Sequence, residues 1–276
     1  MELFSIKNDI LLRDFGQINL PLTLDCGQAF RWKKTSSGSY SGIAAGKETE
    51  VASVDGGIMF YNTSEEDVRN VWINYFDTER DYEGILTSLS KDPHMADTVK
   101  EYGTIRILNQ QPWETLCSFI ISACNNIPRI KGIITRLCEG FGDRLESGYT
   151  FPAPEKLACL TPDDLAFLKA GYRAPYIIDA AKRVASGECD LEAIRKLDPA
   201  AAEKELMKIS GVGKKVADCT MLFGLGFSDT YPVDRHIARA NAEYYPDGLP
   251  ECFNGYRGLA QQYIFYYQMS ESSKIR

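Results

Sequence analysis

The stretch Lys208-Ile-Ser-Gly211-Val-Gly213-Lys-Lys215-Val-Ala-Asp-Cys219 decides how this chain of 276 residues folds. Two glycines stand two residues apart between sequences rich in Ala, Leu and Lys, which favour helices. The glycines let the backbone turn tightly and present bare amide groups at the start of the second helix, an arrangement that suits a phosphate. Lys215 lies in the first turn of that helix, and Asp234 follows it by nineteen residues in Pro232-Val-Asp-Arg-His236. The pair supplies a nucleophile and a carboxylate that can stabilise positive charge.

Each part of this pattern also has a purely structural explanation. Gly-Val-Gly between helices is often only a loop, and Lys214-Lys215 alone is often a solvated face. The conjunction of the hairpin, Lys215, Ala217-Asp218 and Val233-Asp234 at this spacing is more specific. In it the sequence resembles the helix-hairpin-helix motif, with its Gly/Pro-rich loop and aspartate, of the DNA glycosylase superfamily. The resemblance implies that Lys215 and Asp234 are catalytic and that a sugar carbon of DNA is attacked.

The length and composition of the chain fit a globular protein without a membrane segment. Hydrophobic residues make up 44% and charged residues 25% of the sequence, and the length allows two domains or one elaborated domain. No apolar run reaches the roughly 18 residues of a membrane span. The start, Met1-Glu-Leu-Phe4, does not look like a secretory signal. We therefore expect an intracellular monomer, located in the bacterial cytoplasm at the nucleoid, with no membrane partner.

The cysteines give no sign of a metal or of a disulfide framework. They are scattered through expected helices and form no CxxC pair, so reduced thiols are expected. An iron-sulfur cluster needs four closely spaced cysteines, and nothing after Cys252 supplies them. This separates the chain from the endonuclease III branch of the superfamily. We expect no metal and no cofactor. The eight cysteines are Cys26, Cys117, Cys124, Cys138, Cys159, Cys189, Cys219 and Cys252.

The charge balance limits how the chain can hold nucleic acid. It carries 31 basic and 38 acidic residues, a net charge of −7, which argues against binding through bulk electrostatics. The segment 204–239 is slightly basic within this acidic chain. We therefore expect phosphate contacts to come largely from oriented backbone amides, with modest and salt-sensitive affinity.

The hydrophobic periodicity predicts an α+β fold, with a small N-terminal antiparallel sheet domain over residues 1–80 and a mostly α-helical domain over 81–276. Thr63 and Glu66 read as a capping box that begins the first helix. The run Cys117–Cys124 has no amphipathic period and predicts a helix buried on nearly all sides. The expected strands are 30–33, 40–43, 48–54 and 58–61, with a turn at Asp55-Gly-Gly. The expected helices are 112–124, 126–140, 162–169, 174–187, 198–208, 214–225, 234–244 and 255–268.

Further segments resemble the 8-oxoguanine DNA glycosylase branch of the superfamily. Taken singly they have structural readings: Gly27 could shape a bend, Asn125 and Asn126 could cap helices, Arg129 and Arg173 could be surface charges, and Phe265 could be core. Their combination and order carry the resemblance. The segments are Cys26-Gly-Gln-Ala-Phe-Arg-Trp32, Gln111-Pro-Trp-Glu-Thr-Leu-Cys-Ser-Phe-Ile-Ile-Ser-Ala-Cys-Asn-Asn-Ile-Pro-Arg129, Gly171-Tyr-Arg-Ala-Pro-Tyr176 and Gly258-Leu-Ala-Gln261 with Phe265.

This resemblance implies a binding site for a flipped-out base. The carbonyl of Gly27 would accept the N7 proton that 8-oxoguanine carries and guanine lacks, a contact worth roughly 1 to 3 kcal/mol of discrimination. Cys219 and Phe265 would sandwich the base, and Gln261 would bind its pairing edge. Lys215 and Cys219 are four residues apart and therefore lie on one helical face.

The resemblance also implies how the rest of the DNA is held. Tyr172 would wedge into the vacated stack, and Arg129 and Arg173 would bind the orphaned cytosine. The family has an asparagine where this chain has Cys124, and a thiol is a weak donor, so we expect looser recognition of the opposite base. The remaining implied contacts to the opposite strand or the DNA backbone are Asn125, Asn126, Gly211, Gly213 and His236.

The implied activity is that of a bifunctional DNA glycosylase/AP lyase acting on double-stranded DNA that contains 8-oxoguanine. Lys215 must be neutral to attack C1′, which burial or the positive charge of Lys214 would favour. The Schiff base that follows allows strand nicking by β-elimination. Two alternatives stay open: a glycosylase of the same superfamily for oxidised pyrimidines or mispaired adenine, and a non-catalytic DNA-binding module. Gly27, Gln261 and Phe265 argue against the first, and Lys215 with Asp234 against the second.

Overall fold

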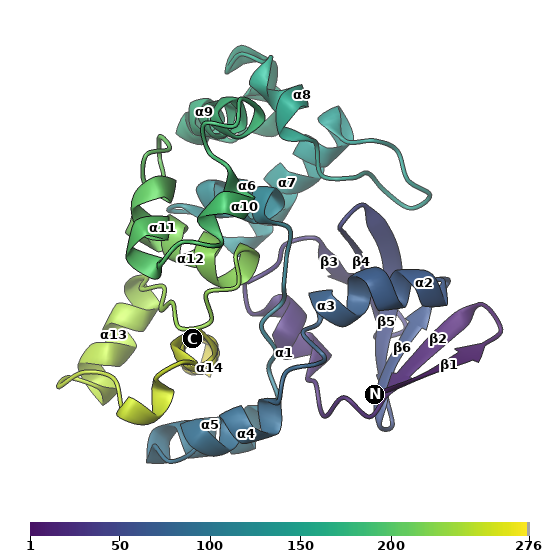
Figure 1. Ribbon diagram of the computed structural model, residues 1–276, viewed down its shortest axis with the longest axis vertical. Helices are drawn as coiled ribbons and strands as arrows, with labels where there is room; N and C mark the ends of the chain where they lie inside the picture. Colours follow the sequence, from purple (N-terminus) through teal and green to yellow (C-terminus); the bar gives the residue numbers. More distant parts are fainter. Residues whose placement is uncertain (275–276) are drawn as a thin grey trace.

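The computed structural model describes the backbone of residues 1–274 and the side chains of residues 1–270. A sheet near the N-terminus lies to one side of a larger assembly of helices (Figure 1). The predicted fold class, a small antiparallel sheet followed by a mostly helical part, is confirmed. No helix in the described part of the chain is both long enough and apolar enough to cross a membrane.

The sheet has six antiparallel strands, where the sequence predicted four. The two additional strands are β1 (Glu2–Ile6) and β2 (Asp9–Arg13), which form a hairpin at one edge in the order β1-β2-β6-β5-β4-β3. Alternate residues of the central strands face the core, as a half-buried sheet requires. The four predicted strands are present as β3 (Trp32–Lys34), β4 (Tyr40–Ala44), β5 (Lys47–Val54) and β6 (Gly57–Tyr61).

The first helical segment after the sheet begins one residue later than predicted. Ser64, not Thr63, is the N-cap, because its hydroxyl oxygen accepts the N–H of Asp67. The segment also contains a π-turn, so it runs as α2 (Glu65–Asp67), the π-helical Val68–Trp72 and α3 (Ile73–Tyr75). Trp72 packs edge-on against Trp32 with ring centroids 6.0 Å apart, which closes the core beneath the sheet.

The predicted helices after residue 110 are present, but 162–169 is a short 3-10 helix, Asp163–Leu168. Five helices were not predicted: α1 (Leu20–Asp25), α4 (Tyr82–Leu89), α5 (Pro93–Tyr102), α8 (Pro154–Ala158) and α10 (Leu191–Ile194). The others are α6 (Pro112–Ser122), α7 (Ile127–Phe141), α9 (Ala174–Ala185), α11 (Pro199–Leu206), α12 (Lys214–Gly224), α13 (Arg235–Tyr244) and α14 (Arg257–Lys274).

Helix α6 is the buried helix that the sequence predicted. Its residues from Thr115 to Ile121 are all buried, and the helix packs against α12. Phe119 of α6 stacks on Phe223 of α12 with ring centroids 5.5 Å apart. This contact anchors the helix that carries Lys215 against the centre of the helical core.

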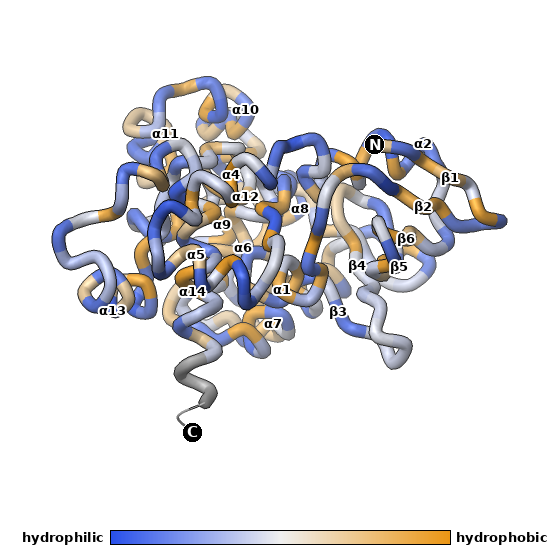
Figure 2. The backbone as a smooth tube through the Cα atoms, turned by 90° about the horizontal axis from the view of Figure 1, so that it is seen from below, coloured by the Kyte–Doolittle hydropathy of each residue, from blue (hydrophilic) through white to orange (hydrophobic). Residues whose placement is uncertain are grey.

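The buried apolar residues form two clusters, one beneath the sheet and one among the helices. Each cluster includes residues from the part of the chain that mainly forms the other one. Leu22 and Phe30 belong to the helical cluster, and Leu108 belongs to the sheet cluster. The fully buried Arg106 ties these segments together by donating to the carbonyls of Phe15, Gln17 and Asp77 at 2.7 to 3.0 Å. Figure 2 shows the two parts at opposite ends of the molecule. A division between residues 80 and 81 stays a prediction.

Candidate active site

The glycine pair forms a hairpin between α11 and α12, as the sequence predicts. Gly211 has φ +80°, and a Cβ there would lie 2.3 Å from the ring of Tyr176 on α9. Gly213 is the N-cap of α12. Within the described residues, the backbone N–H groups of Gly213, Lys214 and Lys215 donate to no protein acceptor. They are therefore available to a phosphate at the positive end of the helix dipole.

We expect Gly211→Ala to destabilise the protein much more than Gly213→Ala. Alanine at position 211 meets both the left-handed backbone conformation and the Tyr176 ring, whereas no atom lies within 4 Å of a Cβ at Gly213. The penalty at Gly211 should be at least about 1 to 2 kcal/mol in the free energy of unfolding, measured by urea denaturation. Equal losses in the two variants would show that the hairpin does not depend on the Gly211 conformation.

Lys215 lies half-buried in the first turn of α12, with its ammonium group 5.0 Å from the centre of the Phe119 ring. Cys219, one turn later, is buried. Burial raises the pKa of the Cys219 thiol to about 11, although the nearby Lys215 opposes this shift. The thiol is thus protonated at neutral pH and forms an uncharged surface beside the amine.

The side chain of Lys214, unlike that of Lys215, forms ion pairs with carboxylates. Its ammonium group pairs with Glu203 at 2.6 Å and with Asp218 at 3.4 Å. The hydrogen bond to Glu203, with further help from Asp218, raises the pKa of Lys214. Two carboxylates therefore compensate the charge of Lys214 that we expected to act on Lys215.

Asp234 is the N-cap of α13, so its expected structural role is confirmed. Its Oδ1 accepts the backbone N–H groups of His236 and Ile237, both at 2.9 Å. Its Oδ2 has no donor among the residues that the structure describes. The negative charge of Asp234 adds slightly to the raised pKa of the Cys219 thiol. Within the described residues, one carboxylate oxygen of Asp234 is thus free.

Gly27 and Phe265 contact each other, and His236 links Phe265 to Asp234. Gly27 has φ +83°, and a Cβ there would lie 3.8 Å from the Phe265 ring and 3.7 Å from Ile127. Within the described residues its carbonyl accepts no hydrogen bond. Phe265 also contacts the imidazole of His236, with ring centroids 6.0 Å apart and planes at 84°. Gln261, buried one turn before Phe265 on α14, completes the predicted base-binding set.

Arg173 and Tyr172 form a second group around the loop between α6 and α7. Tyr172 is 54% exposed, which suits an intercalating wedge, and its hydroxyl donates to the carbonyl of Ala123 at 3.2 Å. Arg173 is buried and donates to the carbonyls of Ala123, Cys124 and Ala170. It thus holds this loop in place, and its expected contact with a cytosine stays a prediction.

The remaining predicted residues lie on the same loop or follow it. Cys124 is exposed and adopts a left-handed conformation, φ +49°. Asn125 donates to the carbonyl of Ile121 at 3.0 Å. Asn126 caps α7 by accepting the N–H of Arg129 at 3.0 Å, which confirms the capping reading. The exposed Arg129 side chain reaches the carbonyl of Lys169 at 3.4 Å.

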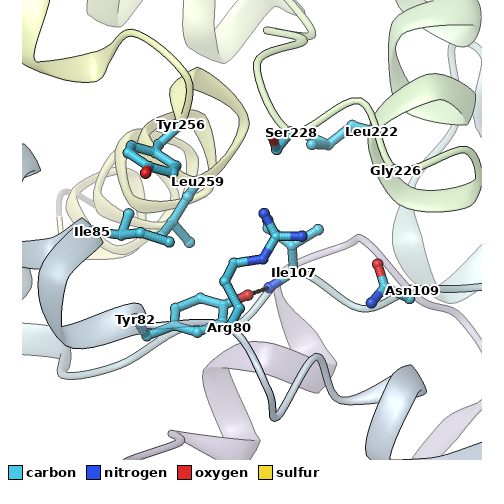
Figure 3. A pocket seen from close by; sticks show the side chains of 10 residues that line it. All are labelled: Arg80, Tyr82, Ile85, Ile107, Asn109, Leu222, Gly226, Ser228, Tyr256 and Leu259. Carbon is cyan, nitrogen blue, oxygen red and sulfur yellow. Dashed lines mark hydrogen bonds between the residues drawn. The ribbon is translucent and has the colours of Figure 1, made fainter.

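A small pocket elsewhere in the molecule is not part of this site. It lies at the opposite end of α12 from Lys215 and contains none of the predicted site residues (Figure 3). Its volume is about 20 Å³, enough for one water molecule but not for a purine. Tyr82 in its wall accepts the N–H of Ile107 at 2.8 Å. Its lining residues are Arg80, Tyr82, Ile85, Ile107, Asn109, Leu222, Gly226, Ser228, Tyr256 and Leu259.

Gln262 makes two polar contacts beside the site that the sequence did not predict. Gln262 donates from Nε2 to Oε1 of Gln261 at 2.6 Å, and it accepts from the thiol of Cys26 at 3.0 Å. Both residues are buried. The signal that could have pointed to Gln262 is a second glutamine inside an otherwise apolar stretch of the last helix.

Comparison with known proteins adds family relationships to this geometry. Residues 10–116 match the family model of the 8-oxoguanine DNA glycosylase N-terminal domain, and residues 117–247 match that of the HhH-GPD superfamily base excision DNA repair proteins. An N-glycosylase/DNA lyase of Saccharomyces cerevisiae is 39% identical over 151 residues, which cover 49% of this chain. The N-glycosylase/DNA lyase OGG1 of Arabidopsis thaliana is 29% identical over 243 residues, or 83% of this chain.

A solved structure matches nearly the whole chain. The Clostridium acetobutylicum 8-oxoguanine glycosylase/lyase, in complex with double-stranded DNA containing cytosine opposite 8-oxoG, superposes with a TM-score of 0.93 at 39% identity. The match covers 99% of both chains. By contrast, the chain spans only 40% and 66% of the lengths of the yeast and plant proteins.

Proposed function

The chain belongs to the 8-oxoguanine DNA glycosylase family of the HhH-GPD superfamily, and we propose that it excises 8-oxoguanine from double-stranded DNA and then nicks the strand as an AP lyase. The observation that carries this proposal is that Asp234 binds the N–H of His236, whose ring contacts Phe265, and that Phe265 meets Gly27, while Lys215 and Cys219 share one face of α12. A nucleophile, a charge stabiliser and a site for a flipped base then lie together.

The DNA backbone is held by the hairpin. The N–H groups of Gly213, Lys214 and Lys215 bind a phosphate without needing a large positive surface, which fits the net charge of −7. His236, half-buried beside Phe265, is a second proposed contact to the backbone. Binding flips the damaged nucleotide out of the duplex, at a cost of a few kcal/mol.

The flipped base is read by its protonated N7 and its two faces. The carbonyl of Gly27, which has no partner within the described residues, accepts the N7 proton of 8-oxoguanine and repels the N7 lone pair of guanine. Cys219 and Phe265 stack on the two faces, and Gln261 binds the pairing edge. The thiol of Cys219 stays neutral there because burial raises its pKa to about 11.

Excision begins when the neutral Lys215 amine forms a bond to C1′ while the bond from C1′ to the base nitrogen breaks. The base leaves with the electron pair and takes up the proton that the nitrogen of Lys215 releases. The free Oδ2 of Asp234 stabilises the positive charge that develops on the sugar. Opening of the sugar ring gives an imine between Lys215 and C1′. Loss of a proton from C2′ then expels the 3′ phosphate and nicks the strand.

A panel of damaged duplexes tests this assignment. We expect single-turnover excision to be fastest on 8-oxoguanine opposite cytosine, with little release of oxidised pyrimidines or of adenine mispaired with guanine. Faster excision of either of the latter substrates would favour the other superfamily activities. Binding of the duplexes without release of any base would favour a non-catalytic module.

We expect Cys124→Asn to sharpen the preference for cytosine opposite the lesion several-fold. An asparagine amide adds a hydrogen bond worth roughly 0.5 to 1.5 kcal/mol that the thiol does not supply. Asparagine also tolerates the φ of +49° at this position, so the loop should not be disturbed. Single-turnover excision from duplexes with each of the four bases opposite 8-oxoguanine measures the effect.

Cys159→Asn is the matched control, because Cys159 is also exposed but lies at the end of α8. It should leave all four rates unchanged. If Cys124→Asn gives the same ranking and ratios as the wild type, position 124 does not read the opposite strand.

We place the reaction at the nucleoid in the bacterial cytoplasm, where chromosomal DNA is the substrate, and we propose that the enzyme acts as a monomer. The proposed domains are residues 1–80 and 81–276. Gly27 comes from the first and Phe265 from the second, so the base-binding site needs both.

A further inference from the structure

A chain of hydrogen bonds leads from Cys26 through Gln262 to Gln261, and the amide of Gln28 beside it is held rigidly. The amide nitrogen of Gln28 donates to the carbonyls of Thr23 and Arg106, both at 2.8 Å. Its oxygen accepts the N–H of Leu108 at 2.9 Å. Gln28 is fully buried. Its amide cannot invert, because inversion would set its oxygen against two carbonyls and its NH₂ group against an N–H.

The chain begins at the thiol of Cys26. Its sulfur lies 3.4 Å from the amide nitrogen of Gln28, but both hydrogens of that nitrogen are given to the carbonyls of Thr23 and Arg106. The thiol donates to Oε1 of Gln262 at 3.0 Å, because the Thr23 carbonyl is farther away, at 3.5 Å, and already accepts from Gln28. Burial raises the pKa of Cys26 to about 12, so the thiol keeps the proton that it donates. The oxygen of Gln262 is therefore turned toward Cys26.

The orientation of the Gln262 amide determines the orientation of the Gln261 amide. With its oxygen on Cys26, Gln262 directs its amide nitrogen to Oε1 of Gln261, at 2.6 Å. The NH₂ group of Gln261 is thus turned the other way, and it has no acceptor among the described residues. Gln261 stands one turn before Phe265, whose ring contacts the position of Gly27. The free donor therefore belongs to the same face of α14 as the proposed base-binding residues.

We propose that Cys26 and Gln262 form a relay that fixes the amide of Gln261 to read a guanine-type pairing edge and to reject an adenine-type edge. A guanine-type edge presents the O6 acceptor beside the N1–H donor. It therefore matches an amide whose NH₂ group faces O6 and whose oxygen faces N1–H. An adenine-type edge presents N6–H beside the N1 acceptor and needs the opposite order. Gln262 and Cys26 are positioning residues, since they act through Gln261.

The Gly27 carbonyl cannot distinguish a guanine-type lesion from an adenine-type lesion, so this discrimination must come from the pairing edge. 8-Oxoadenine carries the same proton on N7 as 8-oxoguanine, so the two lesions differ mainly along the pairing edge. A glutamine amide without fixed partners can rotate and serve either edge. With the relay in place, rotation of Gln261 would set two NH₂ groups against each other and lose a buried hydrogen bond. The inference rests on the proposed function.

The test compares excision of 8-oxoguanine and 8-oxoadenine from otherwise identical duplexes under single-turnover conditions. Gln262→Met and Cys26→Ala should each lower the wild-type preference for 8-oxoguanine about three- to tenfold. The conservative Cys26→Ser keeps a donor and should retain the preference. Gln268→Met is the matched control, because Gln268 is also a buried glutamine of α14. A ratio of two substrates is independent of the fraction of folded protein.

The relay is overturned if the wild type shows no preference between the two lesions, if the ratio is unchanged in Gln262→Met and Cys26→Ala, or if Gln268→Met lowers it equally. The relay is also tested without chemistry, as the ratio of affinities for the two duplexes in a Lys215→Gln background. Failure of the wild type to excise 8-oxoguanine would overturn the proposed function. A ratio of affinities that Gln262→Met does not lower would overturn the relay by itself.

Discussion

Replacing Lys215 with glutamine should abolish both base excision and imine formation while lesion-containing DNA still binds. The change removes the only group proposed to form a bond to C1′, so the excision rate should fall by at least about three orders of magnitude. Glutamine has a similar length and can keep the packing against Phe119. Affinity should change little, because the backbone N–H groups of the hairpin remain. Single-turnover excision and a binding titration on the same duplex measure the two effects.

Lys214→Gln is the matched control, since it alters the neighbouring lysine on the same helical turn. Lys214 pairs with Glu203 and Asp218, so its loss should affect stability slightly and leave the imine in place. If Lys214→Gln loses the imine and Lys215→Gln keeps it, the nucleophile has been assigned to the wrong lysine.

Asp234→Asn should slow excision by about two to three orders of magnitude with a much smaller effect on affinity. The substitution removes the negative charge that is proposed to stabilise the developing cation. It keeps the side-chain oxygen that caps α13 through His236 and Ile237, so the fold should survive. Excision kinetics, circular dichroism and urea denaturation of the same preparation separate the two roles.

Asp190→Asn is the control for the capping role. Asp190 caps α10 by accepting the N–H groups two and three residues ahead, the same pattern as Asp234. Asp190→Asn should match the stability change of Asp234→Asn without the loss of activity. An inactive Asp234→Asn protein that is also unfolded would assign Asp234 to capping alone.

Much of the helical fold could be predicted because long helices carry a strong local signal. The buried run in α6 and the glycine pair before α12 mark those elements directly. Short elements gave weaker signals. The hairpin of β1 and β2 turns at Lys7, a non-glycine residue with φ +59°, and β1 is mostly exposed, so neither a turn motif nor an alternating pattern marked it. Thr63 and Ser64 both fit an N-cap, and only the backbone geometry distinguishes them.

The site could be predicted where its residues share one helix. Lys215 and Cys219, or Gln261 and Phe265, are four residues apart, so helical periodicity brings each pair together. The contact of Gly27 with Phe265 joins distant parts of the chain and came only from family resemblance. Nothing local indicates that Arg173 is tied to backbone carbonyls or that Cys26 bonds Gln262, because tertiary packing creates both contacts.

Borohydride trapping of the wild-type protein on duplex DNA with 8-oxoguanine opposite cytosine, followed by peptide mapping of the covalent product, tests the central claim most directly. Borohydride reduces an imine to a stable amine and so marks the nucleophile. We predict a covalent complex that forms on the 8-oxoguanine duplex and not on the undamaged duplex, with the DNA attached to the peptide that contains Lys215. A complex attached to another residue, or base release without any trapped complex, would contradict the account.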